Sequence, residues 1–153
     1  MEDDILYLDR PGSAKLAYCY TAPKPGVQGT TLVFLPGYMS DMEGGKAMAV
    51  DAWAKQQGRG ILRLDYAGCG ASGGEFEEQS LIDWRDDVLF LIDKVTSGSI
   101  TMIGSSMGGW LMLLVALSRP MRVKNLVGIA AAPDFTDWGF TQEQKMTILR
   151  EGK

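Results

Sequence analysis

The middle of the chain carries, at residues 100–118, the run ITMIGSSMGGWLMLLVALS, in which one apolar segment turns through glycines into another. Residues 100–103 form a short, almost continuously apolar run, as in a strand covered on both faces. Residues 107–118 end before Pro120 and include the stretch Trp110 to Leu117, which is apolar all the way round, as in a buried helix. The run therefore predicts a strand, a tight turn and a central, buried helix.

The turn between these two elements, Gly104-Ser105-Ser106-Met107-Gly108, fits the pattern G-x-S-x-G. Between a strand and a helix this pattern is typical of a nucleophile elbow, whose central residue takes a strained backbone conformation and whose glycines avoid clashes. Ser106 is then the candidate nucleophile, raised above the sheet at a helix N-terminus that stabilises negative charge. Ser105 is in the wrong register for this role. The alternative is that Ser106 only caps the helix, because serine is a favoured N-cap residue.

The same alternation of short apolar runs and longer segments extends along the chain. It predicts further strands at residues 31–35, 61–64 and 126–129 and further helices at 43–57 and 81–95. Residues 5–8 and 16–20, with turn residues between them, predict an N-terminal antiparallel hairpin. The fold class is therefore α/β, with a mostly parallel central sheet and helices on both faces.

The helix expected at residues 81–95 is amphipathic. Its apolar residues form one face, and its charged residues are expected to form a solvated face: Asp83, Arg85, Asp86, Asp87 and Asp93.

Composition excludes several classes of protein. The chain has 153 residues, 46% of them apolar, and 15 Lys+Arg against 19 Asp+Glu give a net charge of -4. This length supports one packed domain, and the mildly acidic balance without basic clusters argues against nucleic acid as a partner. The longest apolar stretch, Trp110 to Leu117, is far shorter than the roughly 20 residues of a membrane span. The acidic N-terminus and the unpatterned Cys19 and Cys69 predict a cytoplasmic location.

A loop is expected after the first central strand, at Leu35-Pro36-Gly37-Tyr38-Met39-Ser40. In enzymes with a nucleophile elbow, the loop at this place supplies the second donor of the oxyanion hole. Pro36 and Gly37 let the backbone turn so that an amide N–H points at a substrate oxygen. We expect the amide of Tyr38 to be this donor, with Met39 as the reserve, beside the amide of Met107. The alternative is a turn that only links the strand to the helix.

A second loop, Asp65 to Ser72, has the spacing D-x-x-G-x-G-x-S. Its glycines do not fit a dinucleotide fingerprint and no Walker lysine follows, so a structural loop is favoured over a phosphate cradle. Cys69 in this loop is expected to be an ordinary loop cysteine, because the chain has no histidine to activate a thiol. No cofactor and no metal is predicted.

Taken together, four motifs resemble those of the α/β-hydrolase fold superfamily: Phe34-Leu-Pro-Gly37, the loop Asp65 to Ser72, Gly104-Ser-Ser-Met-Gly-Gly109 and Ala131-Ala-Pro-Asp134-Phe135. Within it the chain is similar to bacterial hydrolases related to the mitochondrial palmitoyl-protein thioesterase and acyl-glucuronide esterase. The resemblance implies a serine hydrolase that cleaves small-molecule carboxylic esters or thioesters through an acyl-enzyme. It assigns Ser106 as nucleophile and the amides of Tyr38 and Met107 as the oxyanion hole.

The chain departs from this family in one respect. Relatives continue through further strands that supply an acid and then a histidine, and this sequence contains no histidine. The resemblance therefore implies that residues 1–133 are the N-terminal part of a hydrolase core without its last strands, and that residues 134–153 begin a cap. Asp134 is expected to be a cap-entry or turn residue rather than the triad acid. Because the triad acid and histidine are missing, the 153-residue chain alone is expected to show little turnover.

A competing hypothesis is a non-catalytic protein that uses the same scaffold to bind an acyl ligand or a protein partner. Against it, the strand at 126–129 would end the sheet as a bare apolar edge, which natural proteins usually avoid. Self-association or aggregation through this edge is a further expectation, although an identical copy has no histidine to contribute. Met39, Met42 and Met48 are expected to fill the core rather than to line an acyl pocket.

Overall fold

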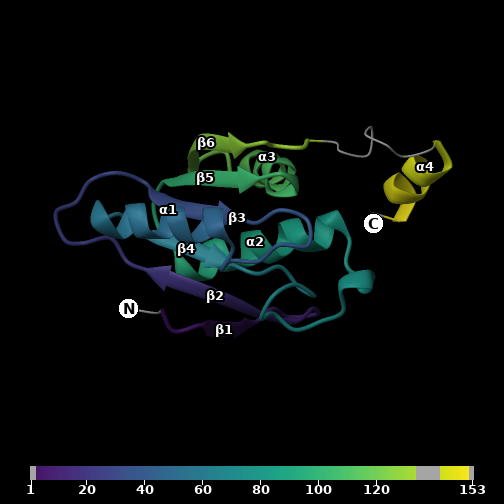
Figure 1. Cartoon of the computed structure of the whole chain (residues 1–153), viewed down its shortest axis with the longest axis horizontal. Coiled ribbons are helices and arrows are strands. Elements are labelled where there is room, and N and C mark those ends of the chain that lie inside the picture. The colour runs from purple at the N-terminus through teal and green to yellow at the C-terminus, as the bar shows by residue number, and fades with distance from the viewer. Residues whose placement is uncertain (1–2, 134–141, 152–153) are drawn as a thin grey trace.

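The computed structural model describes residues 3–133 and 142–151. Within these ranges the chain alternates strands and helices around one sheet (Figure 1). The strands are β1 (Leu6–Asp9), β2 (Lys15–Thr21), β3 (Thr31–Leu35), β4 (Ile61–Leu64), β5 (Ile100–Ser105) and β6 (Val123–Ile129). The helices are α1 (Gly45–Gln56), α2 (Leu81–Val95), α3 (Met107–Ser118) and α4 (Gln142–Glu151), with a short 3₁₀ turn η1 (Phe76–Glu78).

The strands form a mixed sheet in the order β1-β2-β4-β3-β5-β6. β1 pairs with β2, and β2 with β4, in antiparallel register, as expected for an N-terminal hairpin. β4, β3, β5 and β6 are mutually parallel, which confirms the predicted sheet. The carboxyl ends of these four strands therefore meet at one edge, and the loops that follow β3, β4 and β5 lie together there.

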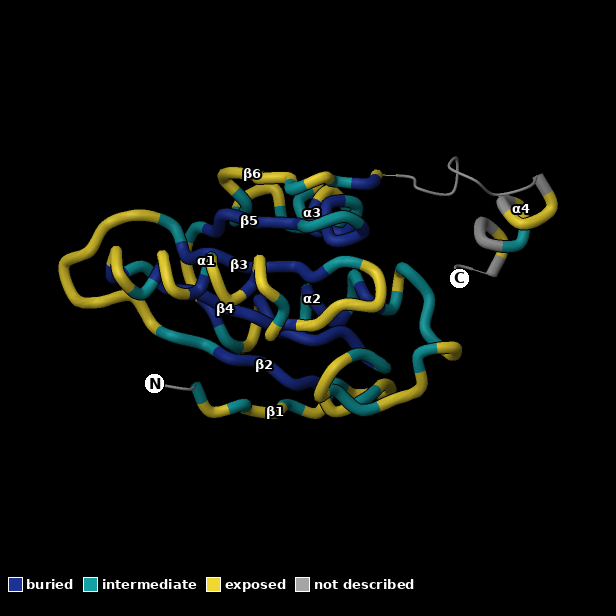
Figure 2. The backbone as a smooth tube through the Cα atoms, in the orientation of Figure 1, coloured by how far each residue is buried: buried dark blue, intermediate teal, exposed yellow. Residues whose placement is uncertain are grey.

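Helices cover both faces of the sheet, with α1 on one face and α2 and α3 on the other (Figure 1). The strands alternate accordingly. On β3, Leu32 and Phe34 pack in a cluster with residues of α1, whereas Val33 and Leu35 belong to the main core with residues of α2 and α3. The central strands β2 to β5 form the buried interior (Figure 2).

Two expectations about burial are wrong at the far side of the sheet. β6 is an edge strand on which Leu126 and Val127 are 41% and 46% exposed, so it is not covered on both faces (Figure 2). α3 is central on one side only, because Leu117 is 79% exposed on its outer side. The reason is the same for both: among the described residues no further layer packs beyond β6. The bare apolar edge itself is as predicted.

No described helix combines the length and the apolar composition that a membrane crossing requires.

Candidate active site

Ser106 lies at the junction between β5 and α3 in a backbone conformation that few residues adopt. Its φ is 54° and its ψ is -118°, a strained region that costs about 1–3 kcal/mol and persists only where the surrounding structure enforces it. Its side chain makes no capping hydrogen bond to α3 and is partly exposed. The junction is therefore the tight strand–helix turn that the sequence predicts, and capping does not account for this serine.

Glycines make the turn sterically feasible. A Cβ atom added at Gly104 would lie 2.3 Å from the carbonyl oxygen of Gly108. One added at Gly108 would lie 2.1 Å from the carbonyl oxygen of Leu35, at the end of β3. Both distances are far below any tolerated contact, so β5, α3 and the loop after β3 approach as closely as they do only because both positions lack a side chain.

The backbone of Ser106 is anchored on two sides. Its amide donates a hydrogen bond to the carbonyl of Ile129 in β6 at 3.1 Å. Its carbonyl accepts hydrogen bonds from the amides of Gly109 and Ala132, each at 2.9 Å. β6 and the segment after it thus help α3 to hold the elbow, and the backbone of Ser106 is held partly by contacts distant in sequence.

The loop after β3 passes directly beside Ser106. A Cβ added at Gly37 would lie 3.1 Å from the Cβ of Ser106, and Tyr38 is the next residue. On the other side of Ser106, Met107 is the first residue of α3, where a backbone N–H has no acceptor within the helix. The structure therefore brings the Tyr38 segment, Ser106 and Met107 together at the carboxyl edge of the sheet.

The methionines near this loop separate into different environments. Met42 is 1% exposed and packs with Ala17 and Cys19, so it fills the core as expected. Met39 is 77% exposed, with a positive φ of 55°, and Met48 is 42% exposed. Met39 and Met48 therefore do not belong to the core.

Ser105 lines a small pocket of about 80 Å³ with the first turn of α1.

The comparisons with known proteins agree with the fold. Residues 30–149 match the family model of the alpha/beta hydrolase fold. The human palmitoyl-protein thioesterase ABHD10, mitochondrial, is 43% identical over 139 residues, which cover 90% of this chain and 44% of that protein. The structure of mouse alpha/beta hydrolase domain-containing protein 10 superposes with a TM-score of 0.83 at 38% identity, covering 97% of this chain and 59% of that one.

The chain belongs to the α/β-hydrolase fold family. Another similar solved structure, Est1E from Butyrivibrio proteoclasticus with ferulic acid bound, has a TM-score of 0.75 at 27% identity, covering 89% of this chain and 57% of that one. The chain spans less than half the length of its human relative.

The relatives contradict one prediction. The human and bovine palmitoyl-protein thioesterases are named mitochondrial, so the cytoplasmic location expected from the sequence is wrong on this comparison. That expectation depends on a few acidic residues at the N-terminus of the sequence, and such a short stretch carries too little information to assign a compartment.

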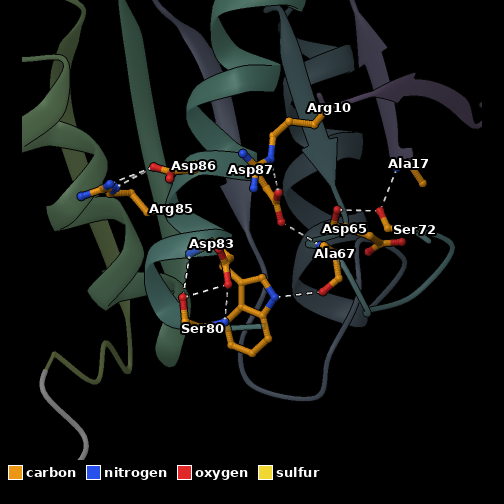
Figure 3. Close-up of polar contacts among 11 residues, drawn as sticks. Arg10, Ala17, Asp65, Ala67, Ser72, Ser80, Asp83, Arg85, Asp86 and Asp87 are labelled. Carbon is orange, nitrogen blue, oxygen red and sulfur yellow. Dashed lines mark hydrogen bonds and ion pairs between the residues drawn. The ribbon is translucent and has the colours of Figure 1, made fainter. Parts of the chain in front are cut away.

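In this α/β-hydrolase chain the loop Asp65 to Ser72 wraps around the Asp65 carboxylate. Asp65 accepts hydrogen bonds from the amides of Met42 at 2.8 Å and Ala71 at 2.9 Å. The Ser72 hydroxyl donates to the Asp65 carbonyl at 2.7 Å and accepts from the Ala17 amide at 2.8 Å (Figure 3). A Cβ at Gly70 would lie 2.2 Å from the Asp65 carboxylate. The spacing D-x-x-G-x-G-x-S thus serves the loop's own structure.

Cys69, in the same loop, is poorly suited to act as a nucleophile. Burial and the nearby carboxylates of Asp65 and Asp87 raise the pKa of its thiol to about 11. The thiol is therefore protonated at neutral pH, whereas nucleophilic cysteines react as thiolates.

One residue of α2 contradicts the predicted solvated face. Asp87 is fully buried, and its carboxylate accepts hydrogen bonds from Arg10 Nε at 2.8 Å and the Ala67 amide at 2.9 Å (Figure 3). Burial raises the pKa of Asp87 to about 6, although both partners oppose the rise. The helical pattern missed this because a single helix cannot show that the N-terminal hairpin covers this position. Asp83 instead forms a capping box with Ser80 at the start of the helix (Figure 3).

Two buried polar residues that the sequence analysis did not single out also contact the loop after β3. The Tyr66 hydroxyl donates a hydrogen bond to the carbonyl of Pro36, and Arg63 Nη1 donates one to the carbonyl of Met42. A polar residue within the otherwise apolar run 61–64 is the signal that could have identified Arg63. Asp134, expected at the entry to a cap, lies outside the described residues.

Among the described residues, no cluster of carboxylate, thiolate or imidazole ligands could hold a metal ion. The chain contains no histidine, so it offers Ser106 no imidazole base. What it does present is a strained, partly exposed serine between a helix N-terminus and a backbone loop, an arrangement suited to binding a tetrahedral oxyanion.

Proposed function

We propose that this chain carries the nucleophile and the oxyanion hole of a serine hydrolase that cleaves acyl thioesters or carboxylic esters. The observation that supports the proposal is the conformation of Ser106, with φ at 54° and ψ at -118°, at a partly exposed position beside Gly37. Backbone strain of this kind is stored where a side chain has to be presented to a ligand.

In the proposed mechanism the Ser106 oxygen attacks the acyl carbonyl carbon while its proton passes to a general base. The amides of Tyr38 and Met107 bind the negative oxygen of the tetrahedral intermediate. The bond to the thiolate or alkoxide leaving group then breaks, the leaving group takes the proton, and an acyl-enzyme remains. Attack by water releases the carboxylic acid and restores the serine.

The base is not a histidine of these 153 residues, because they contain none. We assign the activity to a longer protein that contains this chain, with the acid and the base supplied by residues beyond these 153. Residues 1–133 then form the hydrolase core and residues 134–153, which include α4, begin a cap over the acyl group. Support comes from the relatives, of which this chain covers 44–59%.

A thioester is the favoured substrate class. The human relative, 43% identical, is named a palmitoyl-protein thioesterase. The lack of histidine favours one alternative, a non-catalytic protein that binds an acyl ligand or a protein partner on the same scaffold.

An activity-based probe distinguishes the two hypotheses. The complete reading frame that encodes this chain is expressed, and the protein is treated with a fluorophosphonate that phosphonylates activated serines. Wild type and the control Ser105→Ala, which changes the neighbouring serine, are expected to be labelled and to hydrolyse palmitoyl-coenzyme A, whereas Ser106→Ala does neither. Labelling of Ser106→Ala equal to wild type would reject Ser106 as the nucleophile, and a complete protein without labelling or turnover would favour the binding alternative.

A further inference from the structure

The loop Pro36 to Met42, which carries the Tyr38 amide, is held at its first residue by a buried tyrosine. The Tyr66 hydroxyl donates a hydrogen bond of 2.8 Å to the carbonyl oxygen of Pro36. Tyr66 is 1% exposed, so this bond lies in the interior, where it is stronger than in water and its loss is felt more.

The end of the same loop is held by two neighbours of Tyr66. Met42 donates its amide to Asp65 Oδ1 at 2.8 Å and accepts at its carbonyl from Arg63 Nη1 at 2.7 Å. Arg63, Asp65 and Tyr66 all belong to β4 or the residues directly after it. One strand end therefore holds both ends of the loop, while the segment between them makes a turn in which the Ser40 amide donates to the Gly37 carbonyl.

The Pro36 carbonyl is also contacted from the side of the elbow. A Cβ at Gly108 would lie 2.8 Å from the Pro36 oxygen, so the first turn of α3 packs directly against this peptide group. The peptide between Pro36 and Gly37 is planar, and fixing its carbonyl therefore fixes the direction in which the chain leaves toward Tyr38. Tyr66 on one side and α3 on the other thus determine where the loop lies relative to Ser106.

The ring of Tyr66 is itself immobilised. It packs against Trp84 with ring centroids 5.8 Å apart, and Trp84 Nε1 donates to the Ala67 carbonyl at 2.9 Å. Trp84 in turn packs against Phe76 at 5.4 Å, and Phe76 meets the ring of Tyr38 edge-on at 5.7 Å. A row of aromatic rings therefore connects the buried tyrosine to the side chain of the residue that carries the donor amide.

We propose that the Tyr66 hydroxyl is a positioning residue of the oxyanion hole. It acts through the Pro36 carbonyl to hold the Tyr38 amide at the distance from Ser106 that the tetrahedral intermediate requires. This inference rests on the proposed function. Because a misplaced donor weakens binding of the transition state more than binding of the substrate, its loss lowers kcat and leaves KM nearly unchanged.

The test compares two tyrosine-to-phenylalanine variants of the complete protein. Tyr66→Phe removes the hydroxyl that contacts the loop. The control Tyr18→Phe removes the hydroxyl of another buried tyrosine of the same core, and within the described residues that hydroxyl makes no hydrogen bond to the loop. For Tyr66→Phe we expect kcat for thioester hydrolysis to fall about tenfold or more, with KM within about twofold of wild type. The rate of fluorophosphonate labelling should fall in parallel, and Tyr18→Phe should keep wild-type constants.

The possible failures are distinguishable. Wild-type turnover by Ser106→Ala would reject the proposed function itself. Loss of turnover in Ser106→Ala together with wild-type kcat in a folded Tyr66→Phe would overturn only the positioning role. Should Tyr66→Phe not fold, the wild-type protein is examined by NMR for a slowly exchanging Tyr66 hydroxyl proton with a nuclear Overhauser effect to Gly37; absence of that signal would also overturn the inference.

Discussion

Arg10 and Asp87, 77 residues apart in the sequence, form an ion pair in which Arg10 Nε lies 2.8 Å from Asp87 Oδ1. The pair joins the turn of the N-terminal hairpin to the middle of α2 (Figure 3). The second carboxylate oxygen of Asp87 accepts from the Ala67 amide, in the loop that also contains Asp65. A carboxylate with no exposed surface thus connects three parts of the chain.

The protonation of Asp87 makes stability depend on pH. Its pKa is raised by burial to about 6, whereas an unfolded aspartate has a pKa of about 3.9, so the folded state binds more protons between these values. The free energy of unfolding of wild type relative to Asp87→Asn should therefore increase as pH falls from about 7.5 to about 4.5. Urea unfolding of both proteins at both pH values measures this difference in free energy.

Asp93→Asn provides the matched control for this pH dependence. The hydrogen bond from Arg119 lowers the pKa of Asp93, so the stability from this group is present at neutral pH and is lost as pH falls through that lowered pKa. Between the same two pH values, the free energy of unfolding of wild type relative to Asp93→Asn should change only slightly, and in the opposite direction. A difference between wild type and Asp87→Asn that does not change with pH would contradict the assignment.

A methyl group at the elbow should destabilise the fold. Gly108→Ala would place a Cβ 2.1 Å from the Leu35 carbonyl, a clash with backbone that side-chain movement cannot relieve. We expect a loss of about 1–3 kcal/mol or more in the free energy of unfolding, measured by urea titration. Gly45→Ala, at the first position of α1 with open space around it, should be neutral or stabilising. Equal effects of the two substitutions would show that the close approach does not exist in solution.

The buried ion pair of Arg63 with Asp51 should contribute more to stability than an exposed ion pair. Arg63 Nε lies 3.0 Å from Asp51 Oδ1, and the side chains are 3% and 6% exposed. Arg63→Met leaves a buried carboxylate with fewer partners, and we expect a loss of about 3 kcal/mol. Arg85→Met breaks the more exposed pair with Asp86 and should change stability by less than about 1 kcal/mol. Thermal unfolding of both variants at one pH provides the comparison. A smaller loss of stability in Arg63→Met than in Arg85→Met would refute the prediction.

The edge strand β6 should cause the chain of residues 1–153 to self-associate. An edge strand presents unpaired backbone groups, and here it also exposes Leu126 and Val127. Light scattering after size-exclusion chromatography should show species larger than a monomer that decrease in Val127→Lys. The control Val27→Lys, at an exposed valine in a loop, should associate like wild type. A wild-type chain that is monomeric at high concentration would contradict this expectation.

The sequence alone was sufficient for features that depend on near neighbours along the chain. The expected strands at residues 31–35 and 61–64 and the helices at 81–95 and 107–118 match the observed bounds. Their apolar periodicity is a local property. The glycine at Gly104 is local in the same sense, because the clash that it avoids arises between β5 and the helix that directly follows it, whereas the clash at Gly108 is with the Leu35 carbonyl at the end of β3, which is distant in sequence.

Tertiary structure decided which polar groups are buried and what they contact. The pattern of α2 placed Asp87 on the surface, yet the hairpin of residues 6–21 encloses it with Arg10. The sequence gives no sign that Tyr66 differs from other loop residues, because its hydroxyl contacts Pro36, 30 residues away, only in the folded chain. α3 was expected to be buried throughout, yet it exposes Leu117 where no described layer adjoins it. Burial and hydrogen bonding are properties of two surfaces in contact, and periodicity along one segment describes only one of them.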